Sequence, residues 1–441
     1  MTRQPRPGES GIRVRLQGAV GIRAEEGRAV FWSFCYFFSL LASYYILRPI
    51  RDEMGVTAGI DQMQWLFTGT FIAMLLAVPA FGWIASRFSR KQFLPYIYYF
   101  FIANILLFYV LFESDLALDR VAPVFFIWLS VFNLFVVSVF WSFMADLFRD
   151  DQAKRLFGLI AAGGTTGAIA GPALTVILVQ HLGTGQMLLI SAALLGLSVV
   201  CIGRLLAWQR AVKPASRDVH VTADTPEKPL GGGVLDGIRL VAGSPYLLGI
   251  CLLILLYSTL STFLYFQQAQ IVKDAFEDSG TRTAVFAGID LAVNTLTLLI
   301  QALLTGRLVR WLGLGATLAL IPLMLSGGFL ALGLLPVLWV LVTVQVIRRA
   351  GNYAIMRPAR EMLFVVLSRE EKYKAKNLID TVIYRGGDAA SSWIYAGMRS
   401  LGLSLSTIAW IAIPLSLAWA WIAFQLGRKQ VEVNRREALH T

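Results

Sequence analysis

Residues 121–146 read VAPVFFIWLSVFNLFVVSVFWSFMAD, and the only ionisable side chain in this stretch is the last one, Asp146. A helix needs about 20 mainly apolar residues to cross the hydrocarbon core of a bilayer, and this stretch is long enough. Comparable runs recur along a chain of 441 residues that is 57% hydrophobic and only 15% charged. Soluble domains carry about 25% charged residues, and disordered chains have low hydrophobicity. The composition therefore excludes both classes and predicts a protein with many membrane spans.

The apolar runs predict an all-α membrane protein of twelve transmembrane helices in two six-helix halves. The expected spans are 30–51, 64–85, 93–113, 121–146, 156–180, 185–206, 244–270, 283–305, 314–334, 337–364, 378–398 and 403–425. A polar segment that contains Gly231-Gly232-Gly233 separates the halves and is typical of a linker. The expected organisation is a basic tail at 1–28, halves at 29–206 and 241–426, a linker at 207–240 and a tail at 427–441.

The basic residues predict how the chain is oriented in the membrane. Lys and Arg gather in the loops after even-numbered spans, as at Arg87 and Arg90 after the second and Lys372 after the tenth. Cytoplasmic loops are enriched in Lys and Arg, so both tails and the linker are expected in the cytoplasm. The net charge of +12 is then mainly a property of these loops. It does not indicate a nucleic-acid partner.

Short segments of the first half recur in the same order in the second half. The matching pairs are Gly82–Ser89 (GWIASRFS) with Gly306–Gly313 (GRLVRWLG), Arg149–Lys154 (RDDQAK) with Arg369–Lys374 (REEKYK), and Gly163-Gly164 with Gly386-Gly387. Two parallel halves around a site at mid-membrane are the arrangement of major facilitator transporters. Gly82, Arg87, Arg90 and Lys91 also resemble the signature of their second loop, although Ser86 replaces its usual Asp.

Charged residues inside the spans are the candidates for function, because a charge in hydrocarbon is costly and marks a functional site by default. Arg keeps its charge in proteins, and its planar fork suits phosphate. The cationic candidates are Arg48, Arg51, Arg348, Arg349, Arg360 and Arg385, and the acidic candidates for charge pairing or proton coupling are Asp52, Asp290, Glu361, Asp380 and Asp388. In an α-helix, Gln345, Arg349, Met356 and Arg360 share one narrow stripe. The set predicts a cavity for an anionic, phosphorylated substrate, and structural ion pairs remain the alternative.

Similar charged motifs end the first span and the tenth. Arg48–Met54 reads RPIRDEM, and Arg357–Met362 reads RPAREM. Inverted three-helix repeats within each half would place these motifs at mirrored depths, one toward each side of the membrane. They are candidates for charged gates that open alternately. The alternative is that each motif is a helix end broken by Pro, with charges at the interface.

Gly163-Gly164-Thr165-Thr166-Gly167 in the fifth span resembles a phosphate loop only superficially. The Gly-Lys-Ser/Thr that a P-loop requires does not follow. Small residues in a membrane helix favour close packing against a neighbouring helix, which is the expected role here. The residues of the span are therefore not expected to hydrolyse a nucleotide.

Several further segments match one known family in order along most of the chain. They are Tyr45–Arg48 (YILR) followed by Arg51-Asp52, Phe140-Trp141, Asp151–Lys154 (DQAK), Pro358–Met362 (PAREM), and Lys372–Lys376 (KYKAK) followed by Ile379-Asp380. The chain resembles the ATP/ADP translocases of plastids and intracellular bacteria, in a shorter bacterial form. It departs from them at Arg360 and Ala375, where the family has Lys and Gly, and in having no acid from Trp128 to Phe140.

This resemblance implies a twelve-helix nucleotide exchanger of the major facilitator superfamily, and it adds Lys374 and Lys376 to the candidates for substrate binding. We expect alternating-access transport of an anionic substrate, with ATP/ADP-type exchange as the leading function. A proton-coupled carrier of another small organic anion or zwitterion is the alternative. An enzyme is not expected, and neither a cofactor nor a metal is expected, because no metal-ligand pattern occurs. The expected partners are a nucleotide and the lipid bilayer of a bacterial inner membrane, without nucleic acid or an obligatory protein partner.

Overall fold

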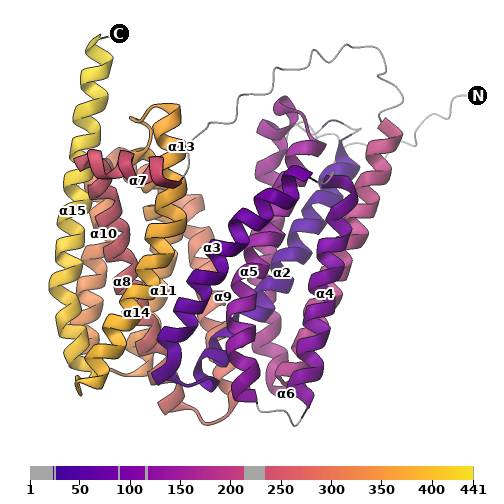
Figure 1. Ribbon diagram of the computed structural model, residues 1–441, viewed down its shortest axis with the longest axis horizontal. Coiled ribbons are helices and arrows are strands. Elements are labelled where there is room, and N and C mark those ends of the chain that lie inside the picture. Colours follow the sequence, from indigo (N-terminus) through magenta and orange to yellow (C-terminus); the bar gives the residue numbers. More distant parts are fainter. Residues whose placement is uncertain (1–22, 24–25, 88–89, 115–117, 213–233, 441) are drawn as a thin grey trace, which may run out of the picture.

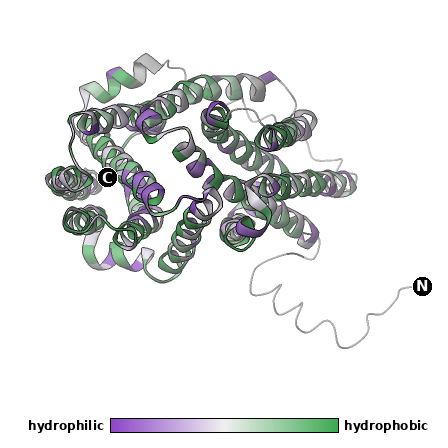
Figure 2. Cartoon of the chain, turned by 90° about the horizontal axis from the view of Figure 1, so that it is seen from below, coloured by the Kyte–Doolittle hydropathy of each residue, from purple (hydrophilic) through white to green (hydrophobic). Residues whose placement is uncertain are grey.

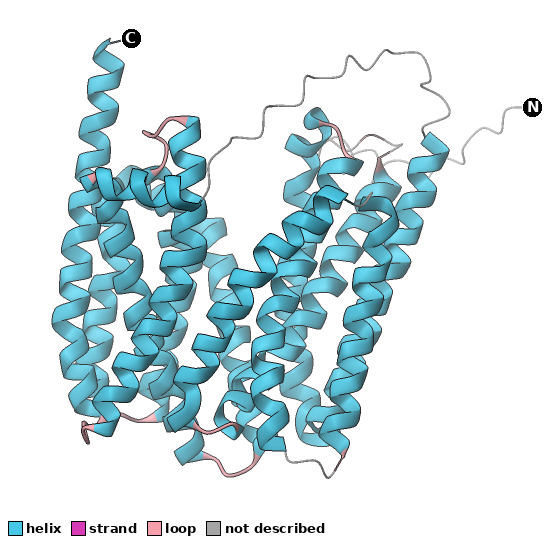
Figure 3. Cartoon of the chain, in the orientation of Figure 1, coloured by secondary structure: helices cyan, strands magenta, loops and turns pink. Residues whose placement is uncertain are grey.

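The computed structural model describes residues 23, 26–87, 90–114, 118–212 and 234–440, and the regular elements of these residues are all helical (Figure 3). This confirms the expected all-α class. Most of the expected N-terminal tail and the linker segment 213–233 lie outside the described residues. In the first part of the chain the elements are α2 (Gly27–Thr57), η1 (Ile60–Gln62), α3 (Met63–Arg87), α4 (Arg90–Glu113), α5 (Leu118–Leu147) and α6 (Asp150–Val212).

The second part of the chain begins with a short helix that lies across the end of the bundle in Figure 1. Its elements are α7 (Val234–Gly243), α8 (Pro245–Ala275), α9 (Ser279–Leu303), α10 (Thr305–Leu334), α11 (Leu338–Gly351), η3 (Asn352–Met356), α12 (Arg357–Leu363), α13 (Arg369–Leu378), η4 (Ile379–Ile383), α14 (Tyr384–Ser400) and α15 (Leu405–His440). The elements η3 and η4 are π-helical turns. Each continues the helix on either side of it.

Nine helices of the described part are long and apolar enough to cross a membrane, namely α2, α3, α4, α5, α6, α8, α9, α10 and α15. The helix α6 is 63 residues long and is interrupted at Gly183, whose φ of 85° lies in the left-handed region that favours glycine. The expected spans 156–180 and 185–206 flank this break. The helical runs 338–363 and 379–400 fall close to two further expected spans, but they carry several charged residues.

Two hydrophobic cores lie side by side in the molecule. Helices α2, α4, α5 and α6 enclose one, around Tyr36, Phe132 and Phe140. The other forms mainly among α8, α10, α11 and α15, around Phe263 and Phe329, and it extends to residues at the α2–α3 connection. The two groups of helices therefore meet at the end that carries this connection. Figure 1 shows them converging at that end and diverging toward the end where α15 finishes.

Close packing between α2 and α6 depends on glycine. Cβ atoms added at Gly163 and Gly167 would collide with the carbonyl oxygens of Phe34 and Phe38, and one at Gly171 would lie 2.7 Å from that of Ala42. Apolar lipid gives little hydrophobic drive for helices to associate, so membrane helices rely on this kind of backbone approach. The packing role expected for the glycine-rich segment is confirmed.

The outer surface of the bundle is strongly hydrophobic. Large apolar side chains such as Leu76, Trp311 and Trp421 are more than half exposed. Seen end-on, the helices are coloured mainly as hydrophobic along the periphery (Figure 2). A continuous apolar exterior of this extent is expected for a surface that faces lipid.

Candidate functional site: a cationic central cavity

A cavity of about 810 Å³ lies between the two groups of helices. Its charged lining residues are Arg48, Arg51, Arg357 and Arg385, and none of the described residues that line it is Asp or Glu. Arg48 and Arg51 come from α2, whereas Arg357 and Arg385 come from α12 and α14. The cavity is therefore cationic on both sides. An anionic ligand would neutralise this charge.

Aromatic side chains hold these guanidinium groups in place. Arg48 lies over the ring of Tyr45 at 5.7 Å from its centroid, and Arg357 lies over Tyr353 at 5.3 Å. Such cation–π contacts are attractive and fix the orientation of long side chains. The remaining polar lining residues are neutral: Tyr44, Ser130, Asn133, Thr165, Asn294, Thr297, Gln301 and Tyr384.

A smaller cavity of about 160 Å³ adjoins the first and shares Arg48, Arg51 and Arg385 with it. It adds the cationic residues Arg348 and Arg349 and the acids Asp52 and Asp388. The two cavities together bring seven of the thirteen candidate residues into one continuous site. This count comprises Arg48, Arg51, Asp52, Arg348, Arg349, Arg385 and Asp388.

The partners of Arg348 in the described part of the chain are neutral. Its guanidinium donates to Gln345 Oε1 at 2.8 Å and to the Ser261 hydroxyl. Gln345 in turn donates to Gln268 Oε1 at 2.5 Å, so the two amides are ordered by each other. The buried positive charge of Arg348 is thus solvated by dipoles and forms no ion pair within the described residues, although Asp388 lines the same smaller cavity.

Asp290 on α9 lines neither cavity, but it contacts Arg48 and Arg349, which do, and so joins the two groups of helices. Its Oδ1 accepts a 2.5 Å hydrogen bond from Arg349 on α11, and its Oδ2 lies 3.5 Å from Arg48 Nε on α2. Oδ2 accepts no hydrogen bond in the described structure. One carboxylate therefore faces two guanidinium groups, and only one of the two contacts is a hydrogen bond.

Acidic residues at the end of α2 contact the second group of helices at the end of the bundle that carries the α2–α3 connection. The two groups meet there, and we call it the closed end. Glu53 is buried and accepts from Arg282 on α9 at 2.6 and 2.9 Å. Asp52 accepts from the Tyr265 hydroxyl on α8 at 2.8 Å. These contacts tie the first helix to the second group of helices.

The other candidate residues lie apart from the cavities. Arg360 faces Asp380 at 3.3 Å, and Lys376 donates to Glu361 at 2.6 Å. Both pairs join α12 to the segment that follows it, within one group of helices. Lys374 lies on the same helix as Lys376, α13, and is half-buried. None of these five residues lines the central cavity or the smaller one.

A family model described as the Major Facilitator Superfamily matches residues 29–372. The chain belongs to this superfamily. A second model, the TLC ATP/ADP transporter, matches residues 329–430, which contain Arg348, Arg349, Arg357 and Arg385. The resemblance to ATP/ADP translocases within the major facilitator fold is confirmed by these matches. The chain is accordingly an integral membrane transporter and not an enzyme.

The relatives of this major facilitator protein include carriers from bacteria and plants. It is 22% identical to ADP,ATP carrier protein 1 of Chlamydia trachomatis over 92% of this chain and 89% of the carrier. It is 23% identical to the chloroplastic ADP,ATP carrier protein 1 of Arabidopsis thaliana over 91% of this chain and 74% of the carrier.

Solved structures show the same fold at low sequence identity. A mutant of the nucleoside transporter NupG aligns with a TM-score of 0.64 and 14% identity, covering 90% of this chain and 98% of that one. A bacterial homologue of the lysosomal transporter Spinster, in an inward-facing and unoccupied conformation, aligns with a TM-score of 0.60 and 13% identity, covering 94% and 99%. These similarities support the major facilitator architecture.

Sequence reasoning did not include Arg357 among the binding residues. The predicted stripe assumed an unbroken α-helix from Gln345 to Arg360. The π-helical turn Asn352–Met356 contains more residues than an α-helical turn, so it rotates the residues that follow it around the helix axis. Tyr353 within this turn and Arg357 directly after it line the central cavity, and Arg360 does not. The residues of this segment show no pattern that indicates a π turn, so the sequence alone did not predict it.

Proposed function

We propose that this major facilitator transporter exchanges nucleotides of the ATP/ADP type by alternating access. The observation that carries the proposal is the central cavity, where four Arg line the wall and no described lining residue is acidic. A triphosphate carries several negative charges, and guanidinium groups bind phosphate oxygens with two parallel hydrogen bonds. A single carboxylate substrate would leave most of this positive charge without compensation.

The relatives support a nucleotide as the substrate. They are named ADP,ATP carriers, and the chain aligns with most of their length. The match to the TLC ATP/ADP transporter model supports the same substrate through the segment that contains four cavity Arg. We assign phosphate binding to Arg48, Arg51, Arg348, Arg349, Arg357 and Arg385. Tyrosine rings along the same walls are suited to stack on a base.

In the empty transporter, carboxylates take the place of the substrate charge. Asp290 faces Arg48 and Arg349, and Asp388 lies 3.7 Å from Arg385. A bound phosphate competes for the same guanidinium groups. We propose that this competition loosens the contact between Asp290 and Arg48, which spans the two groups of helices, and so links substrate binding to rearrangement.

We further propose twelve membrane crossings in two six-helix halves. The nine candidate helices include α6, which the break at Gly183 divides into two crossings, and the runs 338–363 and 379–400 supply two more. The halves then correspond to 29–206 and 241–426, with both tails and the linker 207–240 in the cytoplasm of a bacterial inner membrane. Arg360, Lys374, Lys376, Glu361 and Asp380 act as a charged gate at the cytoplasmic end.

Uptake of labelled ATP into proteoliposomes tests the proposed exchange. The liposomes are prepared with and without internal ADP, and Arg349→Gln is compared with Arg310→Gln, which alters an exposed Arg at the start of α10. Uptake that requires internal ADP, is abolished by Arg349→Gln and persists in Arg310→Gln supports the proposal. Uptake of another anion that depends on a proton gradient, without any nucleotide uptake, would instead identify the proton-coupled carrier.

A further inference from the structure

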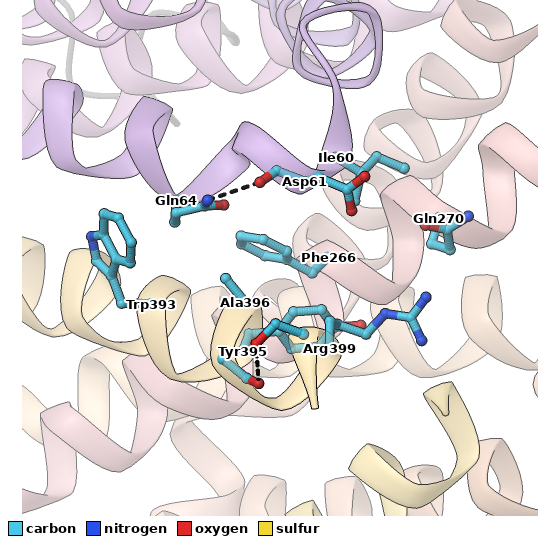
Figure 4. Close-up of a pocket in the computed structure, with 11 residues that line it drawn as sticks. Ile60, Asp61, Gln64, Phe266, Gln270, Trp393, Tyr395, Ala396 and Arg399 are labelled. Atoms are coloured by element: carbon cyan, nitrogen blue, oxygen red, sulfur yellow. Dashed lines mark hydrogen bonds between the residues drawn. The ribbon is translucent and has the colours of Figure 1, made fainter. Parts of the chain in front are cut away.

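A separate cavity, of about 480 Å³, lies at the closed end of the bundle and shares no lining residue with the two cavities of the central site. We call it the closed-end pocket. Residues Asp61 and Gln64 from η1 and α3 form one wall, and Phe266 on α8 with Trp393 and Tyr395 on α14 form the opposite wall (Figure 4). The pocket is thus built from both groups of helices.

Two buried polar atoms of this pocket have no hydrogen-bond partner in the described structure. They are Gln64 Oε1 and the Tyr395 hydroxyl, and their residues are only 9% and 2% exposed. The other end of the Gln64 amide is occupied, because Nε2 donates to the Asp61 carbonyl at 2.8 Å. Buried polar groups nearly always find a partner, and an unpaired one costs free energy. Both atoms are enclosed by neighbouring side chains, so this acceptor and this hydroxyl become available to a ligand when those side chains shift.

The rest of the pocket combines flat apolar surfaces with charge. The Trp393 ring packs edge-on against Trp65, with 4.8 Å between the ring centroids. Its Nε1 donates a 3.0 Å hydrogen bond to the Thr68 hydroxyl. Phe266 adds a second aromatic side chain. Arg399 lies exposed among the lining residues and uses Nη1 for the Leu403 carbonyl at 2.9 Å, which leaves further donors on its fork.

These groups complement a nucleotide. A nucleobase offers an aromatic face for Trp393 or Phe266, an amino donor for Gln64 Oε1 and a ring nitrogen that accepts from Tyr395. The phosphates suit Arg399, and Asp61 at the other wall accepts from ribose hydroxyls. We propose that the closed-end pocket is a second nucleotide site, which holds a nucleotide at this end while the central cavity is open to the other. The inference rests on the proposed nucleotide substrate.

The location of the pocket gives this second site a role in exchange. Its walls belong to η1 and α3 on one side and to α8 and α14 on the other, and these elements must separate when the closed end opens. A nucleotide held there contacts both moving parts. The incoming substrate is then already present at the closed end before that end opens.

Photoaffinity labelling of the full-length, detergent-solubilised protein with 8-azido-ATP tests this site. Labelled peptides are mapped by mass spectrometry, and we expect adducts on α14 near Trp393 as well as on residues of the central cavity. Tyr395→Phe should lower the labelling of α14 about fivefold, because the loss of one hydrogen bond to the ligand weakens binding by about this factor. Labelling of the central cavity should not change. The Tyr395 hydroxyl has no partner to lose, so this variant should keep the thermal stability of the parent protein.

Gln64→Leu provides a second variant, and Tyr96→Phe, which alters an exposed tyrosine on α4, is the matched control. Labelling of the central cavity alone would overturn the second site and leave the proposed function standing. Labelling of α14 that neither Tyr395→Phe nor Gln64→Leu reduces would also overturn it. If neither cavity is labelled, both the second site and the nucleotide substrate are wrong.

Discussion

Arg349 donates a 2.5 Å hydrogen bond to Asp290, and both residues are buried between the two groups of helices. The second oxygen of the same carboxylate faces Arg48 from the other group without a hydrogen bond. Under the proposed function, this shared carboxylate holds the two groups of helices together when no substrate is present. It also leaves one contact weak enough for an anionic ligand to replace.

Replacing Asp290 with Asn should destabilise the empty protein more than the nucleotide-bound protein. Removing one partner of a buried ion pair costs about 3–5 kcal/mol, because the remaining charge is left unpaired. Asp290→Asn should therefore lower Tm by about 5 °C or more, and added ATP should recover part of this loss by supplying negative charge. Thermal unfolding with and without ATP measures both effects. Asp119→Asn, which alters an exposed acid at the start of α5, is the control, and equal Tm values for the two variants would contradict the prediction.

The position of Arg357 in the cavity wall predicts a larger effect on substrate binding than that of Arg360. A hydrogen bond to a charged group contributes about 1.5–3 kcal/mol, so Arg357→Gln should raise the KM for ATP at least about tenfold. Arg360→Gln should change KM by less, because Arg360 faces Asp380 outside the cavity lining. Initial rates of ATP uptake at varied concentration make the comparison. The reverse order of effects would contradict the assignment of Arg357 to the substrate site.

The sequence predicts the helices better than the register within them. Long apolar runs predicted spans that correspond closely to the observed helices, and buried charges such as Arg349 and Asp290 stood out because hydrocarbon excludes unpaired charge. The π turn that places Arg357 depends on packing around the helix. Arg282, which bonds Glu53, lies far from its partner in sequence. The closed-end pocket depends on neutral residues such as Gln64, whose missing partner becomes visible only in three dimensions.

Two glycines on α6 should respond in opposite directions to the same substitution. A Cβ at Gly167 would collide with the Phe38 carbonyl oxygen, whereas one at Gly158 meets nothing within 4 Å. Gly167→Ala should therefore destabilise the protein by about 1–3 kcal/mol through overpacking against α2. Gly158→Ala should raise stability by about 0.5–1 kcal/mol, because alanine loses less backbone entropy in a helix. Thermal unfolding of the two variants in one detergent decides the matter, and a Gly167→Ala protein as stable as the parent would rule out the close packing of α2 and α6.

The buried pair of Glu53 with Arg282 should hold the closed end shut. Arg282→Gln leaves the Glu53 carboxylate buried without its cation, so we expect the closed end to open more often. A cysteine placed at Gln270, which lines the closed-end pocket, reports this opening through its reaction rate with a membrane-impermeant maleimide. Cys35, Cys201 and Cys251 are first replaced by alanine so that the reporter is the only thiol.

The double variant Glu53→Gln with Arg282→Gln distinguishes loss of the pair from loss of one charge. It should label more slowly than Arg282→Gln alone, because it leaves no unpaired charge inside the protein. Arg310→Gln, outside this interface, should label like the parent protein. If all four proteins react at one rate, the Glu53–Arg282 pair does not control access to this end. In that case the closed state must depend on the apolar contacts that join the α2–α3 connection to the second hydrophobic core.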